Sequence, residues 1–224
     1  MPSPLNDPQL EQLLERLHAQ SEGQSDDIVT YFKRRAREEN LDVDRFDDDA
    51  HRFFSDKMVA LEPEKALFCY QLCRSLQARR VVEAGTSFGV STLYLAAAVR
   101  DNAVENGVVI ATEYEPEKAK AARANFEAAK LSDYIELREG DLRETLKTID
   151  GPIDFLLVDI WEVALDALRL VAPHLRPGAV VVCDNTAAHA DYYQPYFEFV
   201  NDPANRLRTM TLPFPGGLEF TVRV

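Results

Sequence analysis

Apolar runs and amphipathic segments alternate along most of this chain. Short runs rich in valine, leucine and isoleucine recur, and longer segments whose apolar residues have helical spacing lie between them. Continuous apolar runs are typical of strands buried on both faces of a parallel sheet, and the intervening helices cover those faces. The pattern therefore predicts an α/β fold. The strands with their polar ends are expected at 81–84, 107–113, 134–142, 153–162 and 179–185.

The last part of the chain has a different pattern. A helical stretch at about 192–200 is followed by two β-rich runs, 207–212 and 218–224, joined by a loop that contains two prolines and two glycines. Such a pair predicts a hairpin with one antiparallel strand, which brings the mostly parallel sheet to seven strands. Before the strand at 179, a helix to Leu175 and a turn at 176–178 are expected.

The first 56 residues are charge-rich and helical in pattern, and we treat them as an extension of a main domain at 57–224. Leu10, Leu13, Leu14 and Leu17 form a stripe that needs another surface to cover it, either a partner subunit or the main domain. The run 42–49 carries five aspartates. A solvated turn and helix start explains them better than a calcium loop, because the ligand spacing and the closing glutamate are absent.

Composition narrows the class of partner. The chain has 224 residues, enough for one α/β domain, and a formal charge of −13, which argues against nucleic acid or an anionic membrane as partner. Cys69, Cys73 and Cys183 are expected to be buried thiols, since no neighbouring histidine or cysteine pair completes a zinc site. Free thiols, with no signal-peptide pattern and no membrane-spanning run, predict a cytoplasmic protein.

A glycine turn joins the first strand to its helix. The stretch 81–91 reads E-x-G-x-x-x-G-x-S, with Gly85 and Gly89 four residues apart. Gly85 would allow a tight turn and close approach of a ligand, and Gly89 would let the helix approach the sheet. Free amides at the helix start, beside Ser91, suit a carboxylate or a phosphate. The dinucleotide fingerprint G-x-G-x-x-G is not matched, and glycines that serve geometry alone remain an alternative.

This stretch resembles the S-adenosylmethionine (SAM) loop of class I methyltransferases, in particular the catechol and caffeoyl-CoA O-methyltransferases. The resemblance covers about 57–224 and implies a Rossmann-like sheet. It also implies that Gly85, Ser87 and Gly89 line the methionine part of SAM, that Ser91 meets its carboxylate and that Glu83 holds the loop. By position, the segment from Val59 to Leu61 would close over the cofactor.

Two further acids follow strands. Glu113 ends the second strand, where a carboxylate can accept from both ribose hydroxyls; a carboxylate near a helix start is the alternative. Tyr114 would then lie against the adenine. By the resemblance Asp141 accepts from the adenine amine and the backbone N–H of Leu142 meets a ring nitrogen. Asp141 also suits the N-cap of the next helix, and both roles can coexist.

Two neighbouring strands end in Asp159 and in the pair Asp184 and Asn185. Parallel strands deliver these side chains to one edge of the sheet, and three hard oxygen donors suit Mg²⁺ or a similar divalent cation. The resembled family holds its metal at these positions, where it takes both hydroxyls of a catechol and lowers the pKa of the one that is methylated. A cation that stabilises an oxygen anion serves an in-line methyl transfer.

The sequence departs from the family at Glu162, where a lysine usually follows the tryptophan and acts as the base. Glu162 is then a base, an extra metal ligand or a solvent-facing residue. We take Asp159 and Glu162 as the candidate catalytic residues. His189, Lys57 or a hydroxide on the metal are the other candidate bases, and a surface histidine is the alternative for His189. Trp161 would pack over the adenine or the acceptor ring, or lie in the core.

The sequence thus predicts a SAM-dependent O-methyltransferase that acts on a small phenol or catechol with the help of a divalent cation. A metal-independent methyltransferase with an altered base is the first alternative, and a SAM-binding protein without turnover is the second. A homodimer is compatible with the leucine stripe.

Overall fold

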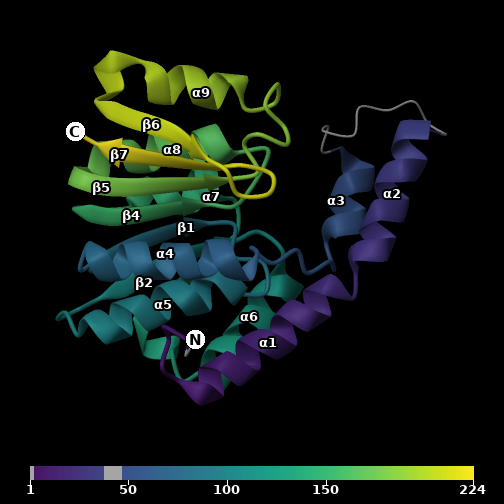
Figure 1. The fold of residues 1–224 in the computed structure, drawn as a ribbon, viewed down its shortest axis with the longest axis horizontal. Helices are drawn as coiled ribbons and strands as arrows, with labels where there is room; N and C mark the ends of the chain where they lie inside the picture. Colours follow the sequence, from purple (N-terminus) through teal and green to yellow (C-terminus); the bar gives the residue numbers. More distant parts are fainter. Residues whose placement is uncertain (1–2, 38–46) are drawn as a thin grey trace.

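A seven-stranded sheet forms the centre of the molecule. The computed structural model describes residues 3–37 and 47–224. The strands are ordered β3-β2-β1-β4-β5-β7-β6 (Figure 1). β7 is antiparallel to both β5 and β6, and the other six strands share one direction, so the predicted sheet with one antiparallel strand is confirmed. The strands are β1 (Arg80–Ala84), β2 (Val108–Glu113), β3 (Ile135–Glu139), β4 (Ile153–Val158), β5 (Leu175–Asp184), β6 (Leu207–Leu212) and β7 (Leu218–Arg223).

Each face of the sheet packs against its own set of helices. Successive strand residues point to opposite faces, so Val81 and Phe155 enter one core while Val82 and Leu156 enter the other. The first core is closed by α4 (Pro63–Ser75), α5 (Val90–Asn102) and α6 (Pro116–Ala128), and the second by α7 (Leu142–Thr145), α8 (Ala164–Val171) and α9 (Gln194–Asn201). Short 3-10 turns lie at Ser132–Tyr134, Leu146–Thr148, Ala172–His174 and Pro203–Asn205.

The first helix, α1 (Pro8–Glu22), packs on the main domain. Asp7 caps it by accepting from the amide of Leu10 at 3.1 Å, and proline follows at the first helical position. The stripe of four leucines is buried in the same core as α4 and α5. His18 also hydrogen-bonds the hydroxyl of Tyr94 on α5, at 3.1 Å. The main domain therefore covers the leucine stripe, and the homodimer stays a prediction.

The helices α2 (Ser25–Arg37) and α3 (Asp48–Phe54) form what we call the helical arm, which stands beside the sheet (Figure 1). Aromatic side chains hold the arm together: the rings of Tyr31 and Phe53 stack with centroids 3.9 Å apart. Arg35, 1% exposed, bonds the carboxylate of Asp47 at 2.8 Å. Asp47 also caps α3, as a helix start requires, whereas 42–46 of the aspartate run lie outside the described residues.

The expected turn at 176–178 is wrong. Strand β5 already begins at Leu175, which pairs with Ile153 on β4, and the register shifts before Phe155 pairs with Val180. Gly178, with φ 79°, supplies the irregular backbone within this stretch. The apolar pattern could not show it, because a bulge and a turn use the same residues.

The cysteines are free and buried, as predicted. Within residues 3–37 and 47–224, no helix combines the length and the apolar character needed to span a bilayer.

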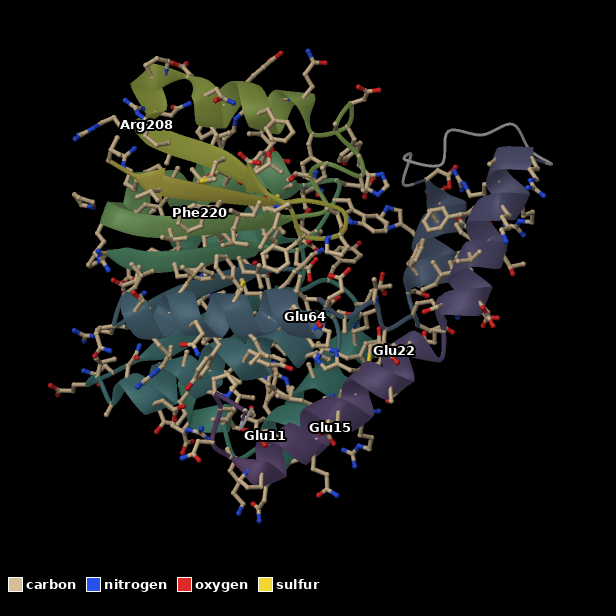
Figure 2. All side chains as sticks on the ribbon, viewed as in Figure 1. Glu11, Glu15, Glu22, Glu64, Arg208 and Phe220 are labelled. Atoms are coloured by element: carbon tan, nitrogen blue, oxygen red, sulfur yellow. The ribbon has the colours of Figure 1, made fainter. Side chains whose placement is uncertain are left out.

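Replacing Leu14 with alanine tests the packing of α1. Leu14 is 2% exposed, so we expect the free energy of unfolding to fall by about 2–4 kcal/mol through the cavity that is left. Urea unfolding followed by circular dichroism measures it. Glu15→Ala, on the solvent face of the same helix (Figure 2), should change it by less than about 0.5 kcal/mol. An unchanged main transition in Leu14→Ala, with loss of helix signal only, would contradict the shared core.

Candidate functional site

The glycine turn between β1 and α5 is shaped by two close contacts. Gly85 has φ 95°, and a Cβ there would overlap the carbonyl oxygen of Asp159 at the end of β4. Gly89 has φ 84°, and a Cβ there would overlap the ring of Phe126 on α6. We predicted that Gly89 lets its helix approach the sheet. This prediction is wrong, because the element that comes close to Gly89 is helix α6. Both positions require glycine, for backbone conformation and for space.

Glu83 ties the turn to the sheet. Its carboxylate is fully buried and accepts from the hydroxyls of Thr86 at 2.9 Å, Ser91 at 2.7 Å and Thr92 at 2.5 Å. Burial, opposed by these three donors, raises the pKa of Glu83 to about 7. The Ser91 hydroxyl is thus directed inward. A ligand carboxylate at this helix end would meet the backbone amides, which no side chain caps.

Glu113 borders the same turn. It is 9% exposed and accepts from the amide of Ser87 at 2.6 Å and from the amide of Glu115 at 2.8 Å. Burial raises the pKa of Glu113. The neighbouring Tyr114 is 64% exposed. The acid and the glycine turn are therefore in direct contact, while the ribose and adenine roles stay predictions.

Asp141 is the N-cap of α7. It accepts from the amide of Arg143 at 2.8 Å and pairs with the guanidinium of the same residue at 2.6 Å, which lowers the pKa of Asp141. Leu142, at the first helical position, is 5% exposed. The capping role is present, and the contact with adenine stays a prediction.

The segment before α4 is held by the end of α1. The Ser21 hydroxyl donates to the carbonyl of Met58 at 2.9 Å and accepts from the amide of Ala60 at 3.1 Å. Val59 is 44% exposed and Leu61 is 3% exposed. Of the two, only Val59 offers its side chain to a ligand, and the closure over SAM stays a prediction.

An acidic corner forms where β4 and β5 end, and we define it as Asp159, Asp184 and Asn185. The strands are in register up to Val158 and Cys183, so the two aspartates that follow are neighbours. The Asn185 amide donates to Asp184 at 2.9 Å. Burial, and then the adjacent Asp184 carboxylate, raise the pKa of Asp159. The predicted meeting of the strand ends is confirmed.

A buried lysine in the corner was missed by the sequence analysis. The ammonium of Lys65, on the first turn of α4, is fully buried and donates to Asp184 at 2.6 Å and to Glu62 at 2.9 Å. Burial alone would lower the pKa of Lys65, but these two carboxylates raise it. The available signal was its spacing, because Lys65 lies on the buried face of α4 with Ala66 and Cys69.

The donor types in this corner fit a hard divalent cation. The Asp159 carboxylate has no hydrogen-bond or ion-pair partner within the described part of the chain, and two carboxylates with an amide oxygen leave room for waters. Asp184 would share its charge between the cation and Lys65. No cluster of three histidine, cysteine, aspartate or glutamate side chains that could hold a metal occurs in the described ranges. Asn185 and water would therefore have to complete the set.

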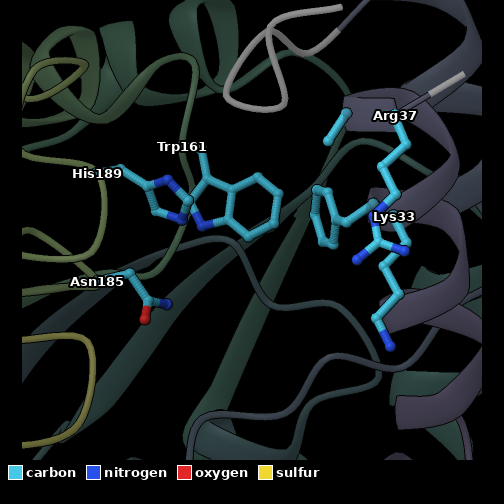
Figure 3. A pocket seen from close by; sticks show the side chains of 7 residues that line it. Lys33, Arg37, Trp161, Asn185 and His189 are labelled. Carbon is cyan, nitrogen blue, oxygen red and sulfur yellow. The ribbon is translucent and has the colours of Figure 1, made fainter. Parts of the chain in front are cut away.

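A pocket of about 400 Å³ opens between this corner and the helical arm. Figure 3 shows Trp161, His189 and Asn185 on one side and Lys33 and Arg37 of α2 on the other. The Trp161 ring lies 5.8 Å from that of His189, measured between centroids. The residues that line the pocket are Phe32, Lys33, Ala36, Arg37, Trp161, Asn185 and His189. Trp161 thus forms part of one wall of the pocket. The sequence analysis did not predict the lining residues of the arm, because that segment shows only a helical pattern.

The candidate bases occupy different surroundings. Glu162 lies 3.2 Å from the imidazole of His51 on α3, so it joins the main domain to the arm. The Lys57 ammonium lies 2.6 Å from Asp56 and over the ring of Phe53. Of the candidates, His189 is the one that lines the pocket.

Known proteins share this architecture. Residues 82–186 match the family model described as a methyltransferase domain. A catechol O-methyltransferase of Mycobacterium tuberculosis is 35% identical over 129 residues, 57% of each chain. Cofactor-bound Rv0187 from MTB is 27% identical, with TM-score 0.68 over 78% of this chain and 88% of that one. An O-methyltransferase from Bacillus cereus in complex with SAH shares the fold at 23% identity, with TM-score 0.65 over 98% of this chain and 92% of that one.

The chain spans a little more than half the length of the curated relatives it matches. The comparisons confirm the resemblance to class I SAM-dependent O-methyltransferases and the Rossmann-like sheet. The matched segment runs from β1 to the residue after Asn185, and so includes both the glycine turn and the acidic corner.

The raised pKa of Glu83 gives stability a specific pH dependence. An unfolded glutamate titrates near about 4.3, so between about pH 4.3 and about pH 7 only the folded state keeps the proton, and stability falls as the pH rises. Over this range we expect the free energy of unfolding of the wild type to fall by about 3 kcal/mol relative to Glu83→Gln. Urea unfolding at several pH values measures the difference, and a constant difference would contradict the raised pKa.

Removing the buried ammonium of Lys65 should lower the free energy of unfolding. Lys65→Met leaves Asp184 buried beside Asp159 without its partner, and we expect a loss of about 3–5 kcal/mol in the free energy of unfolding. Lys65→Met combined with Asp184→Asn removes the uncompensated charge and should recover part of the loss. Thermal unfolding of the three proteins measures this. Equal destabilisation of the single and double variants would show that packing, and not charge, is responsible.

Proposed function

We propose that this chain transfers the methyl group of SAM to a hydroxyl of a small phenolic, catechol-like molecule, with a divalent cation at the acidic corner. One observation carries the proposal: the glycine turn packs directly on the residue that begins the corner. Gly85 lies against the carbonyl of Asp159, and the amide of Asp159 donates to the carbonyl of Ala84 at 2.9 Å. A donor bound at the turn and an acceptor bound at the corner would be immediate neighbours.

The cofactor would lie along the glycine turn. Gly85, Ser87 and Gly89 offer backbone without bulk, and the Glu113 carboxylate is already aimed at this turn through the amide of Ser87. The cofactor-bound state of Rv0187 and the SAH complex of the Bacillus cereus protein support SAM as the donor. The Trp161 side chain lines the acceptor pocket, so we assign it to the acceptor ring.

Asp159, Asp184 and Asn185 would hold the cation. A bound divalent cation supplies positive charge that favours the ionised form of an acceptor hydroxyl. Lys65 fixes Asp184 by its 2.6 Å bond and opposes the rise that burial causes in the pKa of this carboxylate. His189 lines the pocket beside Trp161 and Asn185, and we propose it as the group that takes the hydroxyl proton.

Lys65 also favours a second candidate, a metal-independent methyltransferase. Its ammonium already places one positive charge in the corner, against Asp184. In that case the acceptor would need no pair of neighbouring hydroxyls. The three free, buried cysteines support a reducing, cytoplasmic setting for either enzyme.

Calorimetry and turnover on Asp159→Asn test the proposal. We expect the variant to bind SAM within about threefold of the wild type and to lose about 100-fold or more in kcat/KM for catechols, because one cation ligand is weakened. Asp133→Asn, on an exposed turn, is the matched control. Removal of divalent ions with EDTA should abolish wild-type turnover and Mg²⁺ should restore it.

The outcomes separate the candidates. Turnover that survives EDTA and Asp159→Asn would support the metal-independent enzyme. SAM binding without turnover on any phenol would leave a SAM-binding protein. Absence of SAM binding would overturn the proposal as a whole.

A further inference from the structure

The cations of α2 fall into two pairs with different surroundings. Arg34 and Arg35 turn toward α3, where they bond Asp49 at 3.0 Å and Asp47 at 2.8 Å. Lys33 and Arg37 line the pocket instead, and neither has an acidic partner among residues 3–37 and 47–224. Arg34 and Arg35 therefore stabilise the arm, whereas Lys33 and Arg37 face the pocket.

Two neighbouring cations without an acidic partner are electrostatically unfavourable. Lys33 and Arg37 are four residues apart, so they lie on one helix face and repel each other. The chain as a whole carries a charge of −13, yet this wall of the pocket presents two neighbouring positive charges. A bound anion would relieve the repulsion and gain charge-assisted hydrogen bonds from both side chains.

The wall opposite Lys33 and Arg37 is aromatic and polar. It consists of the rings of Trp161 and His189 and of Asn185, which belongs to the acidic corner (Figure 3). The Phe32 ring, from α2, also lines the pocket. A ligand that spans the pocket would place hydroxyls at the corner, an aromatic ring between the walls and its far end at α2.

We infer that the acceptor is an aromatic acid, with an anionic group held by Lys33 and Arg37 at the end away from the reacting hydroxyl. This inference rests on the proposed function, because it uses the same pocket. The volume of about 400 Å³ accommodates a ring with a short acidic side chain. Lys33 and Arg37 then determine specificity and take no part in the chemical step.

Caffeate and its methyl ester test the inference, because they differ in the carboxylate and share the catechol. Trp161 is the only tryptophan of the chain and lines the pocket, so quenching of its fluorescence reports binding without turnover. We expect Lys33→Met combined with Arg37→Met to raise Kd and KM for caffeate about tenfold. The ester should change by less than about twofold, and kcat for both should be preserved. Arg52→Met, a cation of the same arm that is 80% exposed and outside the pocket lining, is the control.

The readouts keep the two proposals apart. Unchanged caffeate binding in the double variant would overturn the inference, and so would equal losses for caffeate and ester, which would show that the arm was disturbed. Methylation of both compounds with no preference for the acid would leave the proposed function intact and overturn the anion site. Charge-selective caffeate binding without methylation would support the anion site and count against the proposed function.

Discussion

The close approach of β1 and β4 at the carboxyl edge of the sheet is the constraint on which the site depends. These two strands lie at the point where the strand order reverses, so the loops that follow them leave in opposite directions and open a crevice. Gly85 closes the bottom of that crevice by packing its backbone on Asp159. Any side chain at this position would push the glycine turn away from the acidic corner. The two parts of the site would then no longer be adjacent.

Buried charge is the second constraint. Glu83, Asp159 and Asp184 all lie at this edge, and burial opposes ionisation of each. The structure compensates in two ways: three hydroxyls surround Glu83, and the Lys65 ammonium bonds Asp184. Asp159 accepts no side-chain hydrogen bond within the described residues, and Lys65 offsets its burial only in part, so an added cation would favour its ionised form. The corner thus has the electrostatic character that the proposed cation site requires.

The sequence predicted what depends on local pattern. Strand runs, their acidic ends and the hairpin are legible because burial on both faces demands continuous apolar residues, and the strand order then brings Asp159 to Asp184. The partner of Asp184 was not predictable, because Lys65 meets it from α4, 119 residues away in the chain, and its spacing indicates burial but not which acid it pairs with. Gly89 shows the same limit: its sequence context indicates glycine but not that Phe126 of α6 is the neighbour. The 176–178 stretch failed for a local reason, since a proline and a glycine suit a bulge as well as a turn.

The helical arm shows how a segment without a legible motif can still complete a site. Its aromatic cluster reaches the main domain through Phe54, whose ring meets that of Trp161 edge to face at 5.7 Å, and through His51 at Glu162. Glu162, at the position where the resemblance implies a lysine, contacts the arm through His51 at 3.2 Å, and its catalytic role stays a prediction. That contact holds α3, and α3 in turn holds the arginines of α2 through Asp47 and Asp49. The contacts that build the arm therefore also fix the position of α2, the helix that carries Lys33 and Arg37 at the pocket.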